Sequence, residues 1–184
     1  MTLQEKTNAY IRIALPGDIV IFRGTVFISK AIEDITGSWA SHCAVMDCIE
    51  GIPNVIQSTI NKAANGMEVY PFVQEIAGDE DFMVLRTFGF TPQQIRAAID
   101  ILQDKIAEKA KYNKLFYLRI LLWKIFKWND AHITQRNAYV CSQAVQLYTD
   151  ALGITAYKAD SLIIPQDFIT LRPSNILIII NKGL

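Results

Sequence analysis

Apolar positions along this chain follow two spacings, one typical of helices and one typical of strands. Helical spacing is clearest after Thr91 and Pro92, an N-cap residue and a first-turn proline, and it predicts a helix over 92–111. The apolar residues of that helix are Ile95, Ala98, Ile99, Leu102 and Ile106. Further helices are expected over 141–153 and 25–37, each ending at a glycine that can adopt the left-handed conformation which stops a helix.

Short apolar segments between turn-forming residues predict the strands. They lie at 18–22, 42–48, 54–58 and 82–87, and a turn at 51–53 joins the second strand to the third. The segment ILIII near the C-terminus is predicted to be a fully buried strand. This order of strands and helices indicates a mixed α+β fold, and the 184 residues are expected to form one domain with a core and a cleft.

Composition and charge narrow the range of partners and compartments. The chain is 51% hydrophobic and 20% charged, with 18 basic and 18 acidic residues, so it lacks the positive charge with which proteins neutralise nucleic-acid phosphates. An odd count of three cysteines fits poorly with a disulfide framework, and the start MTLQEKTNAYIRIALPG lacks the pattern of a secretory signal. Both features favour the cytoplasm.

One apolar segment, LFYLRILLWKIFKW at 115–128, has two interpretations. It is too short to span a membrane, and Arg119, Lys124 and Lys127 interrupt it. It is either a helix with one buried stripe and basic side chains along its edges, or a helix that rests on a membrane surface. Aromatic stripes at helical spacing usually belong to a core, which favours the first interpretation.

His42 and Cys43 stand side by side in GSWASHCAVMDC and suggest a nucleophile beside its base. If this stretch is a strand, however, neighbouring side chains point to opposite faces of the sheet, and the two cannot share a proton. Cys43 is then expected to be a small buried hydrophobic residue on the face of Val45. Cys48 has no obvious helper in the sequence.

Cys141 has a different setting because it begins the predicted helix CSQAVQLYTDALG. The positive end of a helix lowers the pKa of a thiol, and its free N–H groups can hold an oxyanion. Cys141 is therefore either a buried helix-start residue or a nucleophile. A nucleophile needs an imidazole, for which the chain offers His42 at a strand start and His132 in a polar stretch. Gln57, on the next strand, can accept from the imidazole N–H and fix its tautomer.

Four segments in order, LPGDIVIF, GSWASHCAVM, NVIQST and AYVCSQAVQLY, resemble the permuted NlpC/P60 cysteine peptidases of the YiiX/YaeF-like group. The resemblance runs from about Pro16 to the PQDF segment at 165–168. It implies a circularly permuted papain-like fold, in which a small antiparallel barrel-like sheet is flanked by helices and the histidine strand precedes the cysteine helix.

Carried over by position, the resemblance makes Cys141 the nucleophile, His42 the general base and Gln57 the third residue, where many relatives have a glutamate. Tyr112, followed by Asn113 where the family often has aspartate, corresponds to a substrate or oxyanion contact. The implied activity is cleavage of an amide or peptide bond, including bonds of the cell-wall type, through a cysteine acyl-enzyme without a cofactor.

Three other functions compete with this one. Lipid acyltransferases or thioesterases of the lecithin:retinol acyltransferase type also place histidine before cysteine, but their Asn-Cys-Glu-His context differs from YVCSQA, and their substrates would be lipid esters. A non-catalytic domain that kept the fold is the second, because Gln57 carries no charge. A zinc site of His42, Cys43, Cys48 and Cys141 is the third, and the lack of a Cys-x-x-Cys pair makes it the least favoured.

Overall fold

The computed structural model describes residues 2–25, 30, 33–34, 36–60, 65–114, 137–154, 163–170 and 174–181. Its strands are β1 (Ile19–Gly24), β2 (His42–Ile49), β3 (Ile52–Ile60), β4 (Asn65–Pro71), β5 (Asp79–Thr87), β6 (Lys111–Tyr112), β7 (Ala138–Tyr139) and β8 (Ile176–Ile180). Its helices are α1 (Leu3–Ile11), α3 (Phe72–Ile76), α4 (Pro92–Ala107), α6 (Cys141–Ala151) and α7 (Asp167–Thr170).

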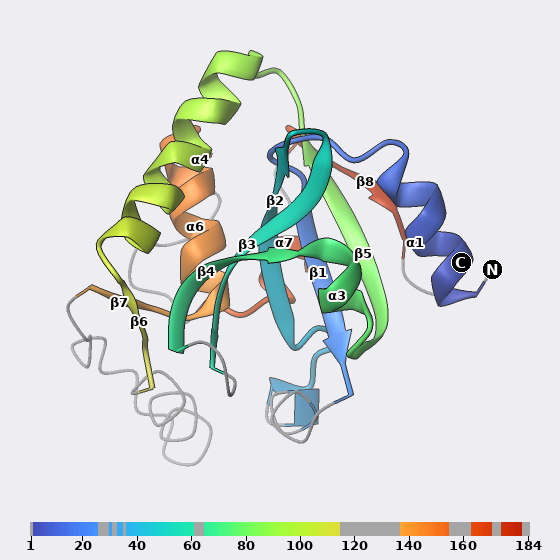
Figure 1. Ribbon diagram of the computed structural model, residues 1–184. Helices are drawn as coiled ribbons and strands as arrows, with labels where there is room; N and C mark the ends of the chain where they lie inside the picture. The colour runs from blue at the N-terminus through green and yellow to red at the C-terminus, as the bar shows by residue number, and fades with distance from the viewer. Residues whose placement is uncertain are drawn as a thin grey trace.

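All eight strands join one sheet that curls into a half-barrel (Figure 1). Their order is β7-β6-β4-β3-β2-β1-β5-β8, and every neighbouring pair is antiparallel except β6 and β7. The described chain is therefore a mixed α+β structure, which confirms that part of the predicted fold class.

Helices α4 and α6 cover one face of the sheet. Ile99 of α4 and Val145 of α6 lie in one buried cluster with Ile21 of β1 and Val45 of β2. Because alternate residues of a strand share a face, Cys43 joins Val45 in this cluster. The first turn of α6 is thus packed against the strand that begins at His42.

Helices α1 and α3 cover the opposite face. Tyr10 of α1 and Phe72 of α3 meet edge to face, with ring centroids 5.2 Å apart, and both pack against Phe82 of β5. Phe22 of β1 belongs to the same buried cluster. Since α3 has only five residues, its buried Phe72 anchors it to this face and fixes where its polar residues lie.

The predicted strands at 18–22, 42–48, 54–58 and 82–87 are confirmed as β1, β2, β3 and β5, and the helix at 141–153 as α6. The expected helix at 25–37 lies partly outside the described residues, although Gly37 has the expected left-handed φ of 65°. The helix predicted over 92–111 ends at Ala107, because the chain turns at Lys109, whose φ is 54°, and enters β6.

Two other predictions are wrong in their details. The β2–β3 turn consists of Glu50 and Gly51, both with positive φ as a two-residue hairpin requires, so that Pro53 lies inside β3 opposite Cys48. Strand β8 is not fully buried: it forms an edge of the sheet, where the side chain of Leu177 is 52% exposed. The sequence patterns do not predict α1, β4 or α3.

Candidate active site

Cys141 is the first residue of α6, as predicted, and is only 6% exposed. Two hydrogen bonds hold the turn around it. The Val140 N–H donates to Gln143 Oε1 at 3.1 Å, and Ser142 Oγ donates to the Ile163 carbonyl at 2.6 Å. The Cys141 N–H, at the first position of the helix, has no carbonyl one turn earlier to bond, so helix geometry leaves it available to a ligand.

The sheet is open beside the beginning of β2. Strands β2 and β3 pair from Val45 and Ile56 to the hairpin turn, whereas His42 and Cys43 pair with β1 alone in the described sheet. The β3-facing edge of residues 42 and 43 is therefore not paired with another described strand, and the beginning of α6 lies beside it. The open edge explains how Cys141 comes close to two consecutive residues of β2, near enough for both His42 and Cys43 to shift the pKa of its thiol.

His42 is held in place by the aromatic ring of Phe22 and by the side-chain amide of Gln57. Its imidazole is 17% exposed and stacks on Phe22, with ring centroids 5.6 Å apart and an interplanar angle of 27°. Its Nε2 lies 2.5 Å from Gln57 Oε1. The structure thus brings together Cys141, His42 and Gln57, the three residues that the sequence proposes for a triad.

The orientation of Gln57 follows from its other partners. Its Nε2 donates to Glu75 Oε2 at 2.9 Å and to Glu68 Oε1 at 3.2 Å. Carboxylates only accept, so the amide nitrogen must face them and the amide oxygen must face His42. His42 Nε2 therefore carries a hydrogen, and Nδ1 is the ring nitrogen left to interact with Cys141.

Electrostatics favour a charged pair between thiol and imidazole. Burial lowers the pKa of His42, but the charge of Cys141, the hydrogen bond with it, the charge of Glu75 and the bond to Gln57 outweigh burial and raise that pKa to about 10. The hydrogen bond from the Cys43 thiol holds the pKa of Cys141 well below its ordinary value, against burial and together with His42. These shifts favour a thiolate beside an imidazolium.

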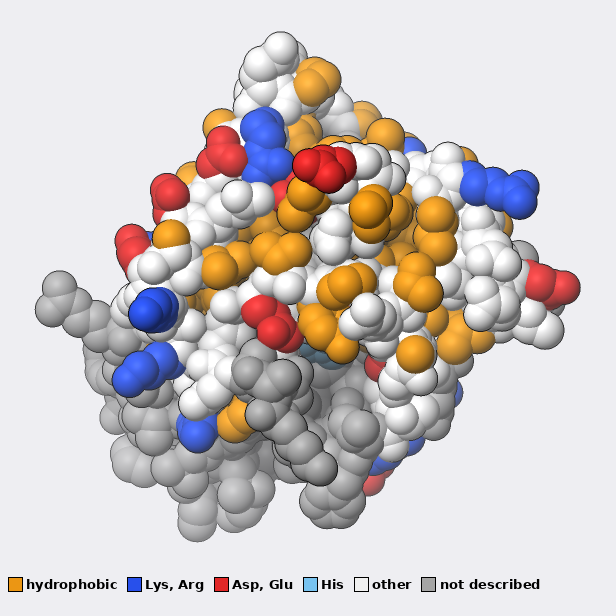
Figure 2. Space-filling model, in the orientation of Figure 1, with side chains coloured by type: hydrophobic (Ala, Val, Ile, Leu, Met, Phe, Trp, Pro, Cys, Tyr) orange, Lys and Arg blue, Asp and Glu red, His pale blue; other side chains and the backbone are white. Residues whose placement is uncertain are grey.

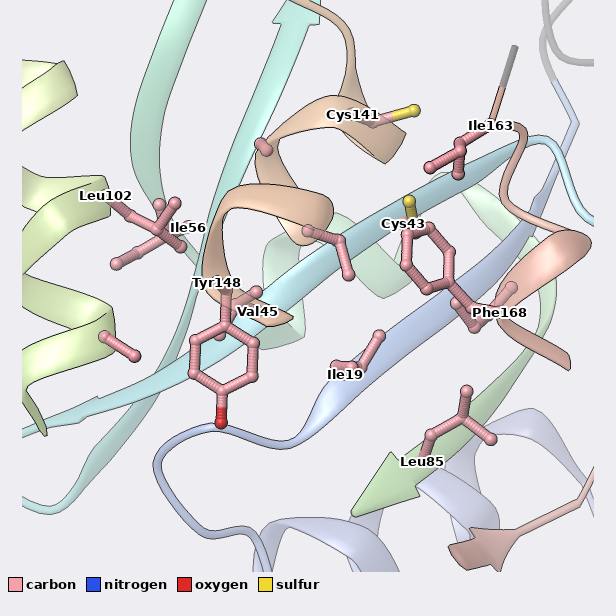
Figure 3. Packing of buried hydrophobic residues seen from close by; sticks show 14 of the residues in the cluster. Ile19, Cys43, Val45, Ile56, Leu85, Leu102, Cys141, Tyr148, Ile163 and Phe168 are labelled. Atoms are coloured by element: carbon pink, nitrogen blue, oxygen red, sulfur yellow. The ribbon is translucent and has the colours of Figure 1, made fainter. Parts of the chain in front are cut away.

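Cys43 has more than the packing role expected from the strand pattern. The expected alternation is present, since Cys43 is fully buried on the α6 face whereas His42 stacks on Phe22 of the opposite cluster. Figure 3 shows the Cys43 thiol projecting from β2 toward the first turn of α6, where the Cys141 sulfur lies. Burial, and then the hydrogen bond with Cys141, raise the pKa of Cys43 and keep it a donor.

The acidic residues behind Gln57 are not predicted by the sequence patterns. Glu75 Oε1 lies 4.0 Å from His42 Nε2, and Glu68 shares the Gln57 amide. Burial raises the pKa of Asp79 to about 7, opposed by the charge of His42 and reinforced by that of Glu75. Glu75 lies in α3, a one-turn helix that is too short to show a helical sequence pattern. For Glu68, only the alternation of residues along β4 could have predicted that its side chain lies on the same face of the sheet as Gln57.

The remaining candidates are placed differently or lie outside the described residues. Tyr112 is in β6, pairs with Tyr139 two residues before Cys141, and is 4% exposed; its substrate contact stays a prediction. His132 and the segment 115–128 lie outside the described residues. Cys48 is near the far end of β2 from His42. Within the ranges described, no helix is both long and apolar enough to cross a membrane.

On the face shown in Figure 2, the charged side chains drawn in colour do not gather into one patch of a single sign. Basic and acidic side chains are interspersed on the face shown in Figure 2, where hydrophobic side chains lie between them. This distribution accords with the formal net charge of zero.

Fold and site together define a mixed α+β half-barrel protein in which a helix beginning with cysteine meets a strand beginning with histidine. A solved structure shares the fold: the chain in "Crystal structure of metalloprotein yiiX from Escherichia coli O157:H7, DUF1105" is 22% identical, with a TM-score of 0.57 over 78% of this chain and 69% of that one. This similarity supports the YiiX part of the resemblance at the level of the fold. No family model matches the chain, and no curated protein matches it.

The YiiX structure is described as that of a metalloprotein. Among the described side chains, no group of three or more His, Cys, Asp and Glu residues is arranged to hold a metal ion. The residues described around His42 therefore do not fit a metal centre.

Proposed function

We propose that this chain is a thiol hydrolase that cleaves an amide bond, with Cys141 as nucleophile, His42 as general acid and base, and Gln57 as the residue that orients the imidazole. The circularly permuted papain-like arrangement of the NlpC/P60 family is part of this proposal. One observation carries it: a helix-start thiol lies close to an imidazole whose Nε2 donates to a fixed amide oxygen.

The reaction would run in two stages. The Cys141 thiolate attacks the carbonyl carbon, a C–S bond forms, and the carbonyl oxygen takes the negative charge beside the Cys141 N–H. As this oxyanion collapses, the C–N bond breaks and His42 Nδ1–H gives its proton to the leaving amine. In the second stage His42 takes a proton from water, the hydroxide adds to the thioester, and loss of the Cys141 thiolate releases the acid.

Peptides, including those of the cell-wall type, are the proposed substrates. Acyl lipids are the substrates of the competing acyltransferase or thioesterase hypothesis. The same thiol and imidazole serve either, because fold and triad do not fix the acyl group.

The first test is selective alkylation of the three cysteines by iodoacetamide at pH 6, followed by mass spectrometry. Because the thiolate reacts, Cys141 is expected to alkylate roughly tenfold or more faster than Cys48 and Cys43. His42→Ala should slow the alkylation of Cys141 but not that of Cys43 or Cys48. Equal rates at all three cysteines would favour the non-catalytic domain.

The second test is a hydrolysis screen of cell-wall peptides, other peptide amides and acyl lipid esters, with Cys141→Ser as the inactive control. Peptide cleavage that Cys141→Ser abolishes supports the proposal. Activity on acyl lipids alone would replace it with the acyltransferase hypothesis.

A further inference from the structure

The imidazolium of the site needs a negative charge that its third residue does not carry. His42 is mostly buried, and a buried cation is costly unless an anion lies near it. Gln57 orients the ring through its amide oxygen but is neutral. The thiolate of Cys141 is one counter-charge, but it is consumed when the acyl-enzyme forms.

Glu75 is placed to supply this charge. Its Oε1 lies 4.0 Å from His42 Nε2, and its Oε2 accepts a hydrogen bond from Gln57 Nε2 at 2.9 Å. One oxygen of the Glu75 carboxylate thus lies near the His42 ring, and the other binds Gln57, the residue that orients this ring. The side chain is 20% exposed, so water screens this charge only in part.

The other charged groups around His42 are less suited to this role. They face it from three elements: the Cys141 thiolate from α6, Glu68 from β4 and Asp79 from β5. Glu68 binds Gln57 at 3.2 Å, and the only ion pair found for His42 among the described residues is with Glu75. Burial raises the pKa of Asp79 to about 7, so its carboxyl is partly protonated at neutral pH.

We propose that Glu75 is a positioning residue of this site. Its carboxylate takes the place of the glutamate that many members of the resembled family have at the position of Gln57. It stabilises the His42 imidazolium directly and, through Gln57, holds Nδ1 toward Cys141. The catalytic consequence rests on the proposed hydrolase function, whereas the effect on His42 does not.

The role of Glu75 also accounts for glutamine at position 57. A carboxylate there would face Glu68 and Glu75, which both now accept from the Gln57 amide, and like charges in contact are unfavourable. Gln57→Glu alone should therefore not strengthen the site. The exchange Gln57→Glu with Glu75→Gln keeps the number of charges and moves one of them next to the ring.

The experiment measures the pKa of His42 by NMR titration of the imidazole Cε1–H in the full chain. The chain has two histidines, so the signal lost in His132→Gln assigns the other to His42. All variants carry Cys141→Ala, which removes the thiolate from the comparison. Circular dichroism checks that each variant is folded.

Glu75→Gln is expected to lower the pKa of His42 by about one to two pH units, as for the loss of an opposite charge at this separation. Glu68→Gln, the matched control, should lower it by less than half as much. The double exchange, Gln57→Glu with Glu75→Gln, should return the pKa of His42 to within about half a pH unit of its value in the protein that carries Cys141→Ala alone. Glu75→Asp, a second variant that keeps the charge but withdraws it by one methylene, should produce a smaller decrease than Glu75→Gln.

A pKa of His42 that is unchanged in Glu75→Gln, or lowered equally by Glu68→Gln, would overturn the proposal, as would failure of the double exchange to restore it. This readout needs no turnover, so an inactive protein with the expected titration would reject the hydrolase function but keep the role of Glu75. If hydrolysis is found, the alkaline limb of kcat should move to lower pH in Glu75→Gln, because the imidazolium that protonates the leaving group is then lost earlier.

Discussion

The contact between Cys43 and Cys141 gives the most direct prediction about the thiol. Cys43 is fully buried, its own pKa is raised, and its thiol points toward the Cys141 sulfur, to which it can donate a hydrogen bond. Cys43→Ala removes this donor while leaving the Cys43 backbone position and His42 in place. Cys43→Ser is the matched control, since a hydroxyl of similar size still donates.

The size of the effect follows from the strength of that hydrogen bond. A hydrogen bond to a charged group contributes about 1.5–3 kcal/mol, and a thiol is a weaker donor than most, so the lower end of this range applies. One pH unit corresponds to about 1.36 kcal/mol. Cys43→Ala should therefore raise the pKa of Cys141 by about one pH unit. The pKa should remain below the ordinary value of a thiol, because His42 and the backbone N–H of residue 43 still interact with the sulfur.

The assay is the pH dependence of Cys141 alkylation between pH 3 and 9, followed by mass spectrometry. Cys48 is the internal reference, because burial and then the charges of Asp18 and Asp47 raise its pKa rather than lower it. The inflection for Cys141 should move up in Cys43→Ala and stay near the unmodified protein in Cys43→Ser. Equal shifts in both variants would show that packing, not hydrogen bonding, is responsible, and no shift in Cys43→Ala would refute the reasoning.

Two further predictions concern stability. Burial raises the pKa of Asp79 from 3.8 to about 7, so its contribution to stability is present below about pH 4 and is lost as pH rises to 7. In urea denaturation, Asp79→Asn should therefore match the original protein to within about 0.5 kcal/mol at pH 3.5 and exceed it at pH 8 by on the order of 2–4 kcal/mol. An equal difference at both pH values would contradict this sign. Gly17 has a φ of 86°, and an added Cβ would overlap the Tyr148 hydroxyl. Gly17→Ala should therefore lower the unfolding free energy by roughly 2–4 kcal/mol. Gly51→Ala is the control: Gly51 also has a positive φ but has open space around it, so this change should cost only about 1 kcal/mol. Similar costs in both glycine variants would refute the packing argument.

Local signals explain which parts of the fold could be predicted from the sequence. Thr91 forms the expected capping box with Gln94, and Cys141 begins its helix, because both features depend on a few neighbouring residues. Helix α3 could not be recognised, since one turn leaves no periodicity to detect and its N-cap residue, Pro71, makes no side-chain hydrogen bond. Glu75 was missed with it.

The proximity of Cys141, His42 and Gln57 could be predicted from the sequence, but the charges around them could not, because these depend on the register of distant strands. Alternation along β2 separated His42 from Cys43 correctly. The end of β2–β3 pairing at Val45 and Ile56 is a property of the assembled sheet, and it is what allows one cysteine to meet both residues. The packing role predicted for Cys43 from strand alternation therefore omits its effect on the pKa of Cys141.

At the open edge of β2, the residues that stabilise the Cys141 anion lie on one face of the sheet, and those that stabilise the His42 cation lie on the other. On the α6 face, the buried Cys43 thiol favours the anionic form of Cys141. On the α3 face, Gln57 and Glu75 favour the cationic form of His42. Each ion is thus stabilised by its own neighbours as well as by the other ion. The two sets of neighbours are therefore expected to be coupled through the ion pair. In a double-mutant cycle that measures the pKa of Cys141, Cys43→Ala and Glu75→Gln should depart from additivity by about 0.5 kcal/mol or more, and strict additivity would show that the two ions do not stabilise each other.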